Sequence, residues 1–152
     1  MTVLVASVLD CPAARVWDEV QRPDLLLEVV RPLVRIVPAE GQPFPQRWRE
    51  GSTVRCRSRL FGIVPTGLRT LFFERIDGAA MEIQTRESEP LIRRWDHLIR
   101  VRALAGGQTH YSDEIVIAAG LATPFVWLFA NWLYRHRQRR WRQVAKRLAA
   151  TA

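Results

Sequence analysis

Three side chains that can move protons lie in two neighbouring extended segments of the chain. His97 belongs to "RRWDHLIRVRA", and Tyr111 and Asp113 belong to "THYSDEIVI". If the segments pair across the two-glycine loop between them with their more apolar faces inward, His97 and Asp113 become diagonal neighbours and Tyr111 lies beyond them. An enzyme could then use His97 as a general base on an enolisable ligand, with Asp113 orienting the imidazole and Tyr111 polarising a carbonyl.

The same side chains also have a purely structural interpretation. Three polar groups on one apolar face can satisfy one another, or hold a water molecule or a ligand carbonyl, because buried polar groups are normally paired. A shift of one residue in strand register would turn Asp113 outward and remove both interpretations. The pattern therefore leaves an enzyme and a binding protein open.

Other chemistry finds little support in the sequence. Cys56 falls on the apolar side of its strand without a basic partner, which is typical of a core cysteine. The chain contains no HxxxH or CxxC motif, no glycine-rich phosphate loop and no GxSxG elbow. We therefore expect no metal and no cofactor.

A row of arginines is predicted on the outer face of two neighbouring strands, opposite the apolar face. The segment "STVRCRSRL" alternates, so Arg55, Arg57 and Arg59 point away from the face that carries Cys56. If the next strand keeps Phe72 inward, its Arg69 and Arg75 extend this outer row. Such a row is either an anion-binding stripe or a solvated face with Glu74 and Glu82 as cross-strand partners.

The whole order of elements predicts an α+β fold. A strand over Thr2–Leu9 is followed by two short helices that begin near Pro12 and Pro23, and "VRIVPA" completes a first hairpin that these helices interrupt. A loop over Glu40–Gly51 precedes a meander of short strands. Because the later loops are too short for crossovers, we expect about seven antiparallel strands in a single domain spanning residues 1–152.

The segment from Thr123 to Ala150 is long enough to cover the apolar face of this sheet. Thr123 is a suitable N-cap, Pro124 fits the first helical position, and about 27 residues at ~1.5 Å each span ~40 Å. Helical spacing predicts a core stripe of Phe125, Phe129, Trp132, Leu133, Val144 and Leu148. The polar face would comprise Asn131, Arg135, Gln138, Arg139, Arg142 and Lys146.

Trp127, Leu128 and Tyr134 fall outside that stripe and form an apolar patch at the start of the helix. The apolar part of the helix covers about 11 residues, too few to span a bilayer. The patch could pack on the loop over Glu40–Gly51, on a partner subunit in a homodimer, or on an anionic membrane surface that attracts the nearby arginines.

The net charge of +8 depends on the C-terminal helix, because residues 135–147 hold seven cations and no acid. The rest of the chain is close to neutral, and the helix lacks accessible aromatic rings if Trp132 and Trp141 face the core. We therefore expect no nucleic-acid partner. Two cysteines and an N-terminus without the basic region of a signal peptide favour a cytoplasmic protein, with peripheral membrane attachment left open.

The sequence resembles a known superfamily. "LDCPAARVWDEVQRPDLLLEVVRPLVRI" is similar to the opening of START-like proteins, the polyketide cyclase/dehydrase and lipid transport (SRPBCC) superfamily. "RLFGIVP", "RRWDHLIRV" and "GGQTHYSDEIVI" resemble its middle hairpins. The resemblance implies a helix-grip fold, in which the sheet curls around the long helix and encloses a cavity for an apolar ligand.

This resemblance implies the binding or carrying of a lipid, polyketide or quinone-like molecule, with an aromatase/cyclase-type enzyme using His97 and Asp113 as the alternative. His136 and Arg140 would line the cavity or reach its rim. The full set of expected cavity residues is Val54, Cys56, Ser58, Phe72, Ile83, Trp95, His97, Ile99, Tyr111, Ile115, Phe129, Trp132, Leu133, His136 and Arg140.

Overall fold

The computed structural model describes residues 1–39 and 41–150. Glu40, the first residue of the expected loop, and the end of the expected domain at 151–152 lie outside the described residues. The strands are β1 (Thr2–Leu9), β2 (Val34–Pro38), β3 (Thr53–Leu60), β4 (Val64–Asp77), β5 (Glu82–Glu89), β6 (Ile92–Ala103) and β7 (Thr109–Ala118). The helices are α1 (Ala13–Val20), α2 (Pro23–Val30) and α3 (Thr123–Ala150), with 3-10 turns η1 (Ala105–Gly107) and η2 (Gly120–Ala122).

The seven strands form one antiparallel sheet in the order β1-β7-β6-β5-β4-β3-β2. The expected number of strands is confirmed, but the expected first hairpin is wrong, because β1 and β2 lie at opposite edges of the sheet. β7 returns beside β1, with Thr2 opposite Val116 and Leu9 opposite Thr109. The two helices between β1 and β2 therefore carry the chain from one edge of the sheet to the other.

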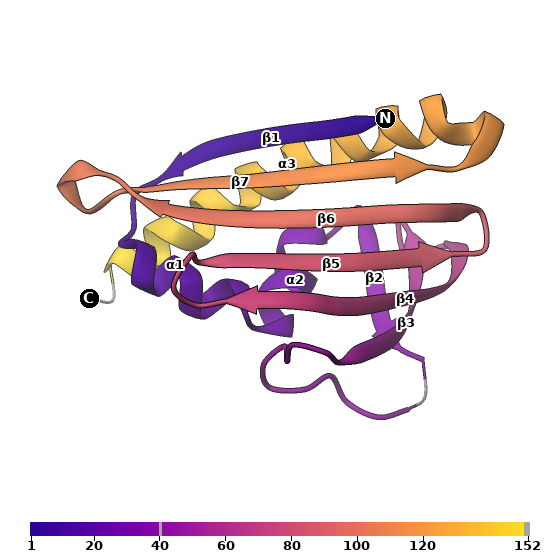
Figure 1. Ribbon diagram of the computed structural model, residues 1–152, viewed down its shortest axis with the longest axis horizontal. Helices are drawn as coiled ribbons and strands as arrows, with labels where there is room; N and C mark the ends of the chain where they lie inside the picture. Colours follow the sequence, from indigo (N-terminus) through magenta and orange to yellow (C-terminus); the bar gives the residue numbers. More distant parts are fainter. Residues whose placement is uncertain (40, 151–152) are drawn as a thin grey trace.

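Helix α3 lies behind the sheet and runs along it in Figure 1, and α1 and α2 cover the end nearer the C-terminus. The helix begins at Thr123 as expected. The Thr123 hydroxyl accepts a hydrogen bond from the Ala119 amide at 2.9 Å and donates one to the Gly120 carbonyl at 2.7 Å. These bonds fix the corner between β7 and α3 and so set the direction in which the helix crosses the sheet.

The buried face of α3 is rotated from the expected stripe. Tyr134 and Gln138 are buried, although the sequence placed both outside the core, and Ala130 is fully buried against the sheet. Phe125 and Trp132 were expected in the core but are 74% and 48% exposed. A small residue such as Ala130 lets the helix approach the sheet closely. The sequence pattern considered only how apolar each helix face is, and so it did not indicate that the face with this small residue packs on the sheet.

Strand β4 faces the other way from the expectation. Leu71 and Phe73 are buried, whereas Phe72 is 37% exposed, so Arg69 points inward with Leu71. The two faces of "LRTLFF" are almost equally apolar, and alternation alone could not choose between them. A register shift between Ser58 and Arg59 of β3 bends this hairpin before the buried part of β4 begins.

The proline-rich loop packs on the sheet and not on the aromatic residues at the start of α3. Trp48 is buried and stacks on Phe73 of β4 with ring centroids 4.7 Å apart. This loop and the start of α3 lie far apart in Figure 1. The expected contact between the loop and the apolar patch of α3 is therefore wrong.

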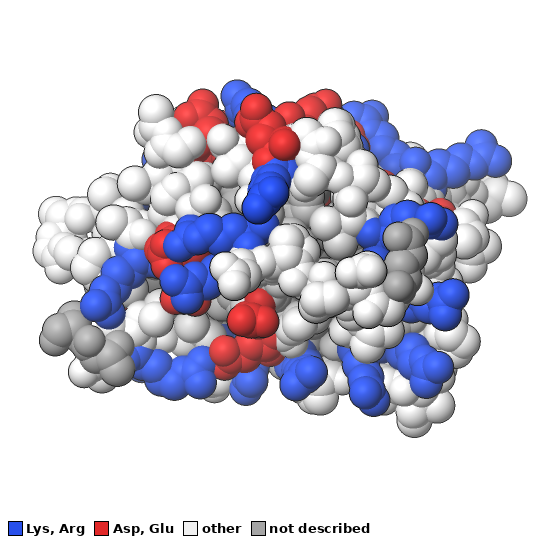
Figure 2. All heavy atoms as spheres, turned by 90° about the horizontal axis from the view of Figure 1, so that it is seen from below, with Lys and Arg blue, Asp and Glu red and all other residues white. Residues whose placement is uncertain are grey.

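The charged side chains are dispersed over the face drawn in Figure 2. Basic side chains lie along much of its lower and right borders, and acidic ones gather near its middle and upper edge. On the outer surface of the sheet, Arg75 contacts Glu82 at 2.8 Å and Arg86 contacts Glu74 at 2.8 Å. Arg55, Arg57 and Arg59 are exposed, as expected.

Candidate functional site

A cavity of about 560 Å³ lies between the sheet, α2 and α3. Its walls are mainly aliphatic and aromatic, with contributions from every strand except β1. Val64, Leu91 and Phe125 line one end of it and are themselves 54%, 79% and 74% exposed, so the cavity opens there. These residues lie at the start of β4, in the β5–β6 turn and at the start of α3.

Most of the residues that the sequence predicted for the cavity do line it in the structure. They are Val54, Cys56, Ser58, Ile83, Trp95, His97, Ile99, Tyr111, Phe129 and Leu133. Burial raises the pKa of the Cys56 thiol to about 12, so this cysteine stays protonated and unreactive at neutral pH.

Five expected residues lie elsewhere. Ile115 is buried, but it packs in a second apolar cluster with Val3 of β1. The other four residues do not line the cavity, because the face of the strand or helix that carries them points away from it. Phe72 follows the reversed facing of β4. Trp132 and the partly exposed His136 and Arg140 lie away from the cavity on α3: a ring nitrogen of His136 is 2.8 Å from the Arg31 carbonyl, and Arg140 contacts Gln143.

His97 and Asp113 are in direct contact. Nε2 of His97 lies 2.8 Å from Oδ1 of Asp113, because Asp113 sits opposite Ile99 and is the diagonal neighbour of His97. The Tyr111 hydroxyl donates to the same oxygen at 3.1 Å. The hydroxyl proton of Tyr111 is thus directed at Asp113 and not into the cavity, which speaks against its expected role of polarising a ligand carbonyl.

Asp113 is a fully buried carboxylate that accepts several hydrogen bonds. Gln138 donates to its second oxygen at 2.7 Å, and the Arg137 guanidinium lies 4.0 Å from the first. Burial by itself would raise the pKa of Asp113, but the charge of Arg137 and the hydrogen bonds from His97 and Gln138 outweigh it and hold the pKa below its usual value. Asp113 is therefore ionised at neutral pH.

Tyr134 is a functional candidate that the sequence did not suggest. Its hydroxyl lies 3.4 Å from Nδ1 of His97 and accepts from Nε1 of Trp95 at 3.4 Å, and it lines the cavity. Since an ionised Asp113 only accepts, a neutral His97 carries its proton on Nε2 and leaves Nδ1 to accept from Tyr134. Burial raises the pKa of Tyr134, so its phenol remains protonated.

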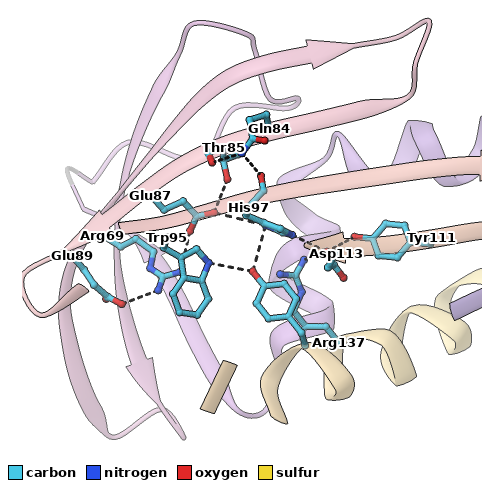
Figure 3. Close-up of polar contacts among 11 residues, drawn as sticks. Arg69, Gln84, Thr85, Glu87, Glu89, Trp95, His97, Tyr111, Asp113 and Arg137 are labelled. Carbon is cyan, nitrogen blue, oxygen red and sulfur yellow. Dashed lines mark hydrogen bonds and ion pairs between the residues drawn. The ribbon is translucent and has the colours of Figure 1, made fainter. Parts of the chain in front are cut away.

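A second charged group lies on β4 and β5 (Figure 3). Arg69 contacts Glu87 at 3.0 Å and Glu89 at 2.8 Å, and its guanidinium lies 4.9 Å from the ring centroid of Trp95. Thr85 donates to Glu87 at 2.8 Å. Once Ile83 is placed inward, a period of two along β5 would have predicted that residues 85, 87 and 89 share its face.

These ionisable and phenolic groups form one side of the cavity, which we term the polar wall. It consists of Arg69, Glu87, Glu89, His97, Tyr134 and Arg137. Among residues 1–39 and 41–150, no group of three His, Cys, Asp or Glu side chains is arranged to hold a metal ion. No helix in this part of the chain is long and apolar enough to cross a bilayer.

Comparison with protein families decides the classification. A family model described as a domain of unknown function (DUF8410) matches residues 7–145. The chain belongs to this family. None of the curated proteins with which this DUF8410 sequence was compared matches it significantly.

Solved structures extend the comparison to the fold. A protein from Chromobacterium violaceum has a TM-score of 0.74 at 12% identity, covering 95% of this chain and 96% of the other. A START superfamily protein from Mycobacterium smegmatis has a TM-score of 0.71 at 12% identity, with 97% and 98% covered. The Zhui aromatase/cyclase from a Streptomyces species has 0.69 at 16%, with 97% and 94% covered. The DUF8410 chain therefore has the START-like helix-grip fold, and at these identities the likeness establishes the fold alone.

Proposed function

We propose that this protein binds and carries a small hydrophobic molecule of the lipid, polyketide or quinone-like class in the cavity between the sheet and α3. The observation that carries the proposal is the 560 Å³ cavity itself, with its mainly apolar lining and an opening at one end. Small-molecule sites typically enclose about 300–1,000 Å³ and combine apolar walls with a few polar groups. The fold shared with a START superfamily protein, a sheet packed against a long helix, is consistent with a cavity of this kind.

A membrane surface is the proposed source of such a ligand. Leu91 and Phe125 line the opening and are exposed, and Leu121 and Leu128 are exposed within four residues of Phe125 along the chain. Arg93 is exposed and follows Leu91 closely in the sequence, and Arg135 is exposed and follows Trp132. This combination of apolar and basic side chains suits the headgroup region of an anionic bilayer. Of the expected patch, Leu128 takes part, whereas Tyr134 is buried and Trp127 donates to the Thr2 carbonyl at 2.8 Å.

An enzyme of the aromatase/cyclase type is the alternative, favoured by the 2.8 Å contact between His97 and Asp113 and by the similarity to an aromatase/cyclase. In this version the Tyr134 phenol donates a hydrogen bond to a ligand carbonyl, Nδ1 of His97 takes the proton from the carbon next to that carbonyl and leaves an enolate, and Asp113 stabilises the imidazolium that forms. Tyr134 takes the place that the sequence assigned to Tyr111.

The carrier proposal is tested by displacement of the neutral fluorescent probe N-phenyl-1-naphthylamine, together with native mass spectrometry of the purified protein. Val54 is a partly exposed residue on the cavity wall, and Val54→Trp should fill part of the cavity and weaken probe binding at least 10-fold. Arg57→Trp, which adds the same ring to the outer face of β3, should leave binding unchanged. Absence of probe binding, or equal affinity in both variants, would contradict the proposal.

The same titration in His97→Ala separates the two functions. A carrier keeps its affinity for the probe in this variant and converts no ligand in either form. An enzyme binds in both forms but converts a polyketide-like ligand only with His97 present, as followed by mass spectrometry of the bound molecule.

A further inference from the structure

The cavity differs in polarity between its opening and its opposite end. Along β5, Glu89 is close to the turn that carries Leu91 of the opening, and Ile83 lies further in. Along β6, His97 comes before Ile99, which pairs with Ile83. On these two strands, the residues of the polar wall therefore precede this isoleucine pair on the way in from the opening.

The far end of the cavity is apolar and closed. It is lined by Val20, Trp48, Leu71, Phe73 and Ile83, each at most 8% exposed. Trp48, which stacks on Phe73, also donates its backbone amide to the carbonyl of Gln21 at the end of α1, at 2.9 Å. The contact between the proline-rich loop and α1 thus shuts this end, which offers a ligand mainly aliphatic and aromatic surface.

Ser58 is an unpaired polar side chain near the opening. It lies on β3 one inward-facing position before Leu60, which pairs with Val64 of the opening. Ser58 lines the cavity and is 5% exposed, and its hydroxyl has no hydrogen-bond partner among the described residues. In this part of the chain, the unpaired side-chain atoms that lack accessible surface all belong to arginine and glutamate side chains. The Ser58 oxygen therefore does have accessible surface, and it faces the cavity.

No neighbouring side chain competes for the Ser58 hydroxyl. Opposite it are Gly67 on β4 and Ile36 on β2, neither of which has a hydrogen-bonding side chain. Thr66 donates to the backbone carbonyl of Ser58 at 3.2 Å and leaves the side chain available. Water can pair with this hydroxyl in the absence of ligand, but a wholly apolar ligand that displaced the water would leave it buried and unpaired.

We infer that the cavity takes an amphipathic ligand apolar end first, with that end beside Trp48 and with an oxygen at the other end accepting a hydrogen bond from the Ser58 hydroxyl. The ligand class is a molecule with one long apolar part and one oxygen-bearing end, such as an alcohol or a ketone. Ser58 is the specificity-determining residue for the oxygen, and Trp48 belongs to the apolar subsite. This inference rests on the proposed binding function.

Quenching of tryptophan fluorescence by bromine tests the orientation. A strand rises about 3.3 Å per residue, so β3 covers about 13 Å between Ser58 and Val54, which pairs with Leu71 of the closed end. The probe 10-bromodecan-1-ol has a similar extended length and carries its bromine at the apolar end. It should quench the fluorescence more than 1-decanol does, and Trp48→Phe should remove at least half of this additional quenching.

Two further variants complete the quenching experiment. Trp127→Phe is the control and should leave the additional quenching unchanged, because Trp127 donates to the Thr2 carbonyl and does not line the cavity. Trp95→Phe reports the opposite orientation, since Trp95 contacts Arg69 of the polar wall. Loss of the additional quenching in Trp95→Phe, with its survival in Trp48→Phe, would place the bromine beside the polar wall.

Ser58→Ala tests the hydrogen bond. The competitors 1-decanol and 1-chlorodecane displace the bound N-phenyl-1-naphthylamine probe, and only the alcohol carries the oxygen. The ratio of their affinities should shift by about 3- to 10-fold against the alcohol in Ser58→Ala, and comparing ratios between proteins cancels the difference in hydrophobicity. Ser88→Ala, which removes an exposed hydroxyl on β5, is the matched control and should leave the ratio unchanged. Circular dichroism checks that each variant is folded.

The outcomes separate this inference from the proposed function. If the probe binds but the additional quenching survives in Trp48→Phe, the apolar end does not lie at the closed end. If Ser58→Ala leaves the ratio unaltered, Ser58 does not hold the oxygen. Either result refutes the inference and leaves a carrier without this binding mode, whereas a protein that does not bind the probe at all fails as a carrier first.

Discussion

At the scale of residues, Asp113 organises the centre of the molecule. It accepts hydrogen bonds from His97, Tyr111 and Gln138 and faces Arg137, so four side chains from β6, β7 and α3 meet at one carboxylate. Gln138 is in turn the acceptor for the Ser7 hydroxyl of β1. A buried carboxylate with this many partners rigidifies the packing of helix on sheet whether or not the site performs chemistry.

The pKa of Asp113 predicts a pH-dependent contribution to stability. Asp113→Asn should lower the free energy of unfolding at pH 7 by about 3 kcal/mol, because Arg137 loses its buried counter-charge. The folded-state pKa lies below the ordinary value of 3.8, so the stabilisation is complete above that value and is lost as the pH falls through the folded-state pKa. Urea denaturation of both proteins at pH 7 and pH 3 should show the difference shrinking at the lower pH. A difference that stays constant would contradict this assignment.

At the scale of elements, β4 decides which side chains form the polar wall. Its register shift opposite β3 precedes the segment in which Arg69, Leu71 and Phe73 point inward. Gly67 lies at the irregularity with φ of +108°, a conformation that side chains rarely adopt. A Cβ there would lie 3.3 Å from Cδ of Pro90, in the turn between β5 and β6.

Gly67→Ala should therefore strain the β3–β4 hairpin. We expect a loss of about 1–3 kcal/mol in the free energy of unfolding from the backbone conformation and the contact with Pro90. Gly78→Ala is the matched control, because Gly78 has no positive φ and a Cβ there meets nothing within 4 Å. Thermal unfolding of the two variants measures the difference, and equal melting temperatures would show that the hairpin accommodates the side chain.

At the scale of the whole molecule, the cavity opening and several exposed apolar residues lie at the same end. The start of α3, the β5–β6 turn and the end of β7 are together on the right of Figure 1. Leu91 and Phe125 are both on the cavity lining and exposed. A ligand leaving a bilayer at this end would enter the cavity without crossing water.

Binding to a membrane surface should depend on this end of the molecule. Co-sedimentation should occur with anionic vesicles and weaken at high salt, since each nearby cation contributes about 1 kcal/mol only at a charged surface. It should also fall when Phe125 and Leu128 are both replaced by Ser, because their apolar contact with the bilayer is then lost. The control replaces Val8 and Leu104 by Ser, two exposed apolar residues away from the opening, and should bind like the unaltered protein. Equal recovery with neutral vesicles, or equal loss in both variants, would argue against docking through the opening.

The sequence by itself determined the order of elements and much of the strand facing. Local signals were enough for this: Thr123 and Pro124 start α3, and strict alternation along β6 and β7 puts His97 and Asp113 on one face. The contact between them then follows from the short loop that fixes the register of that hairpin. The START-like fold was likewise predictable from the order of motifs.

Only the tertiary structure decided the facing of β4, the rotation of α3 and the composition of the polar wall. Arg69 and Arg137 carry charges that a local pattern assigns to solvent, and they are buried because Glu87, Glu89 and Asp113, distant in the sequence, compensate them there. Tyr134 and Gln138 face the sheet because the close approach of α3 at Ala130 sets its rotation. Whether a charge or a helix face is buried depends on the residues that pack against it. The sequence of a single helix or strand does not specify those partners.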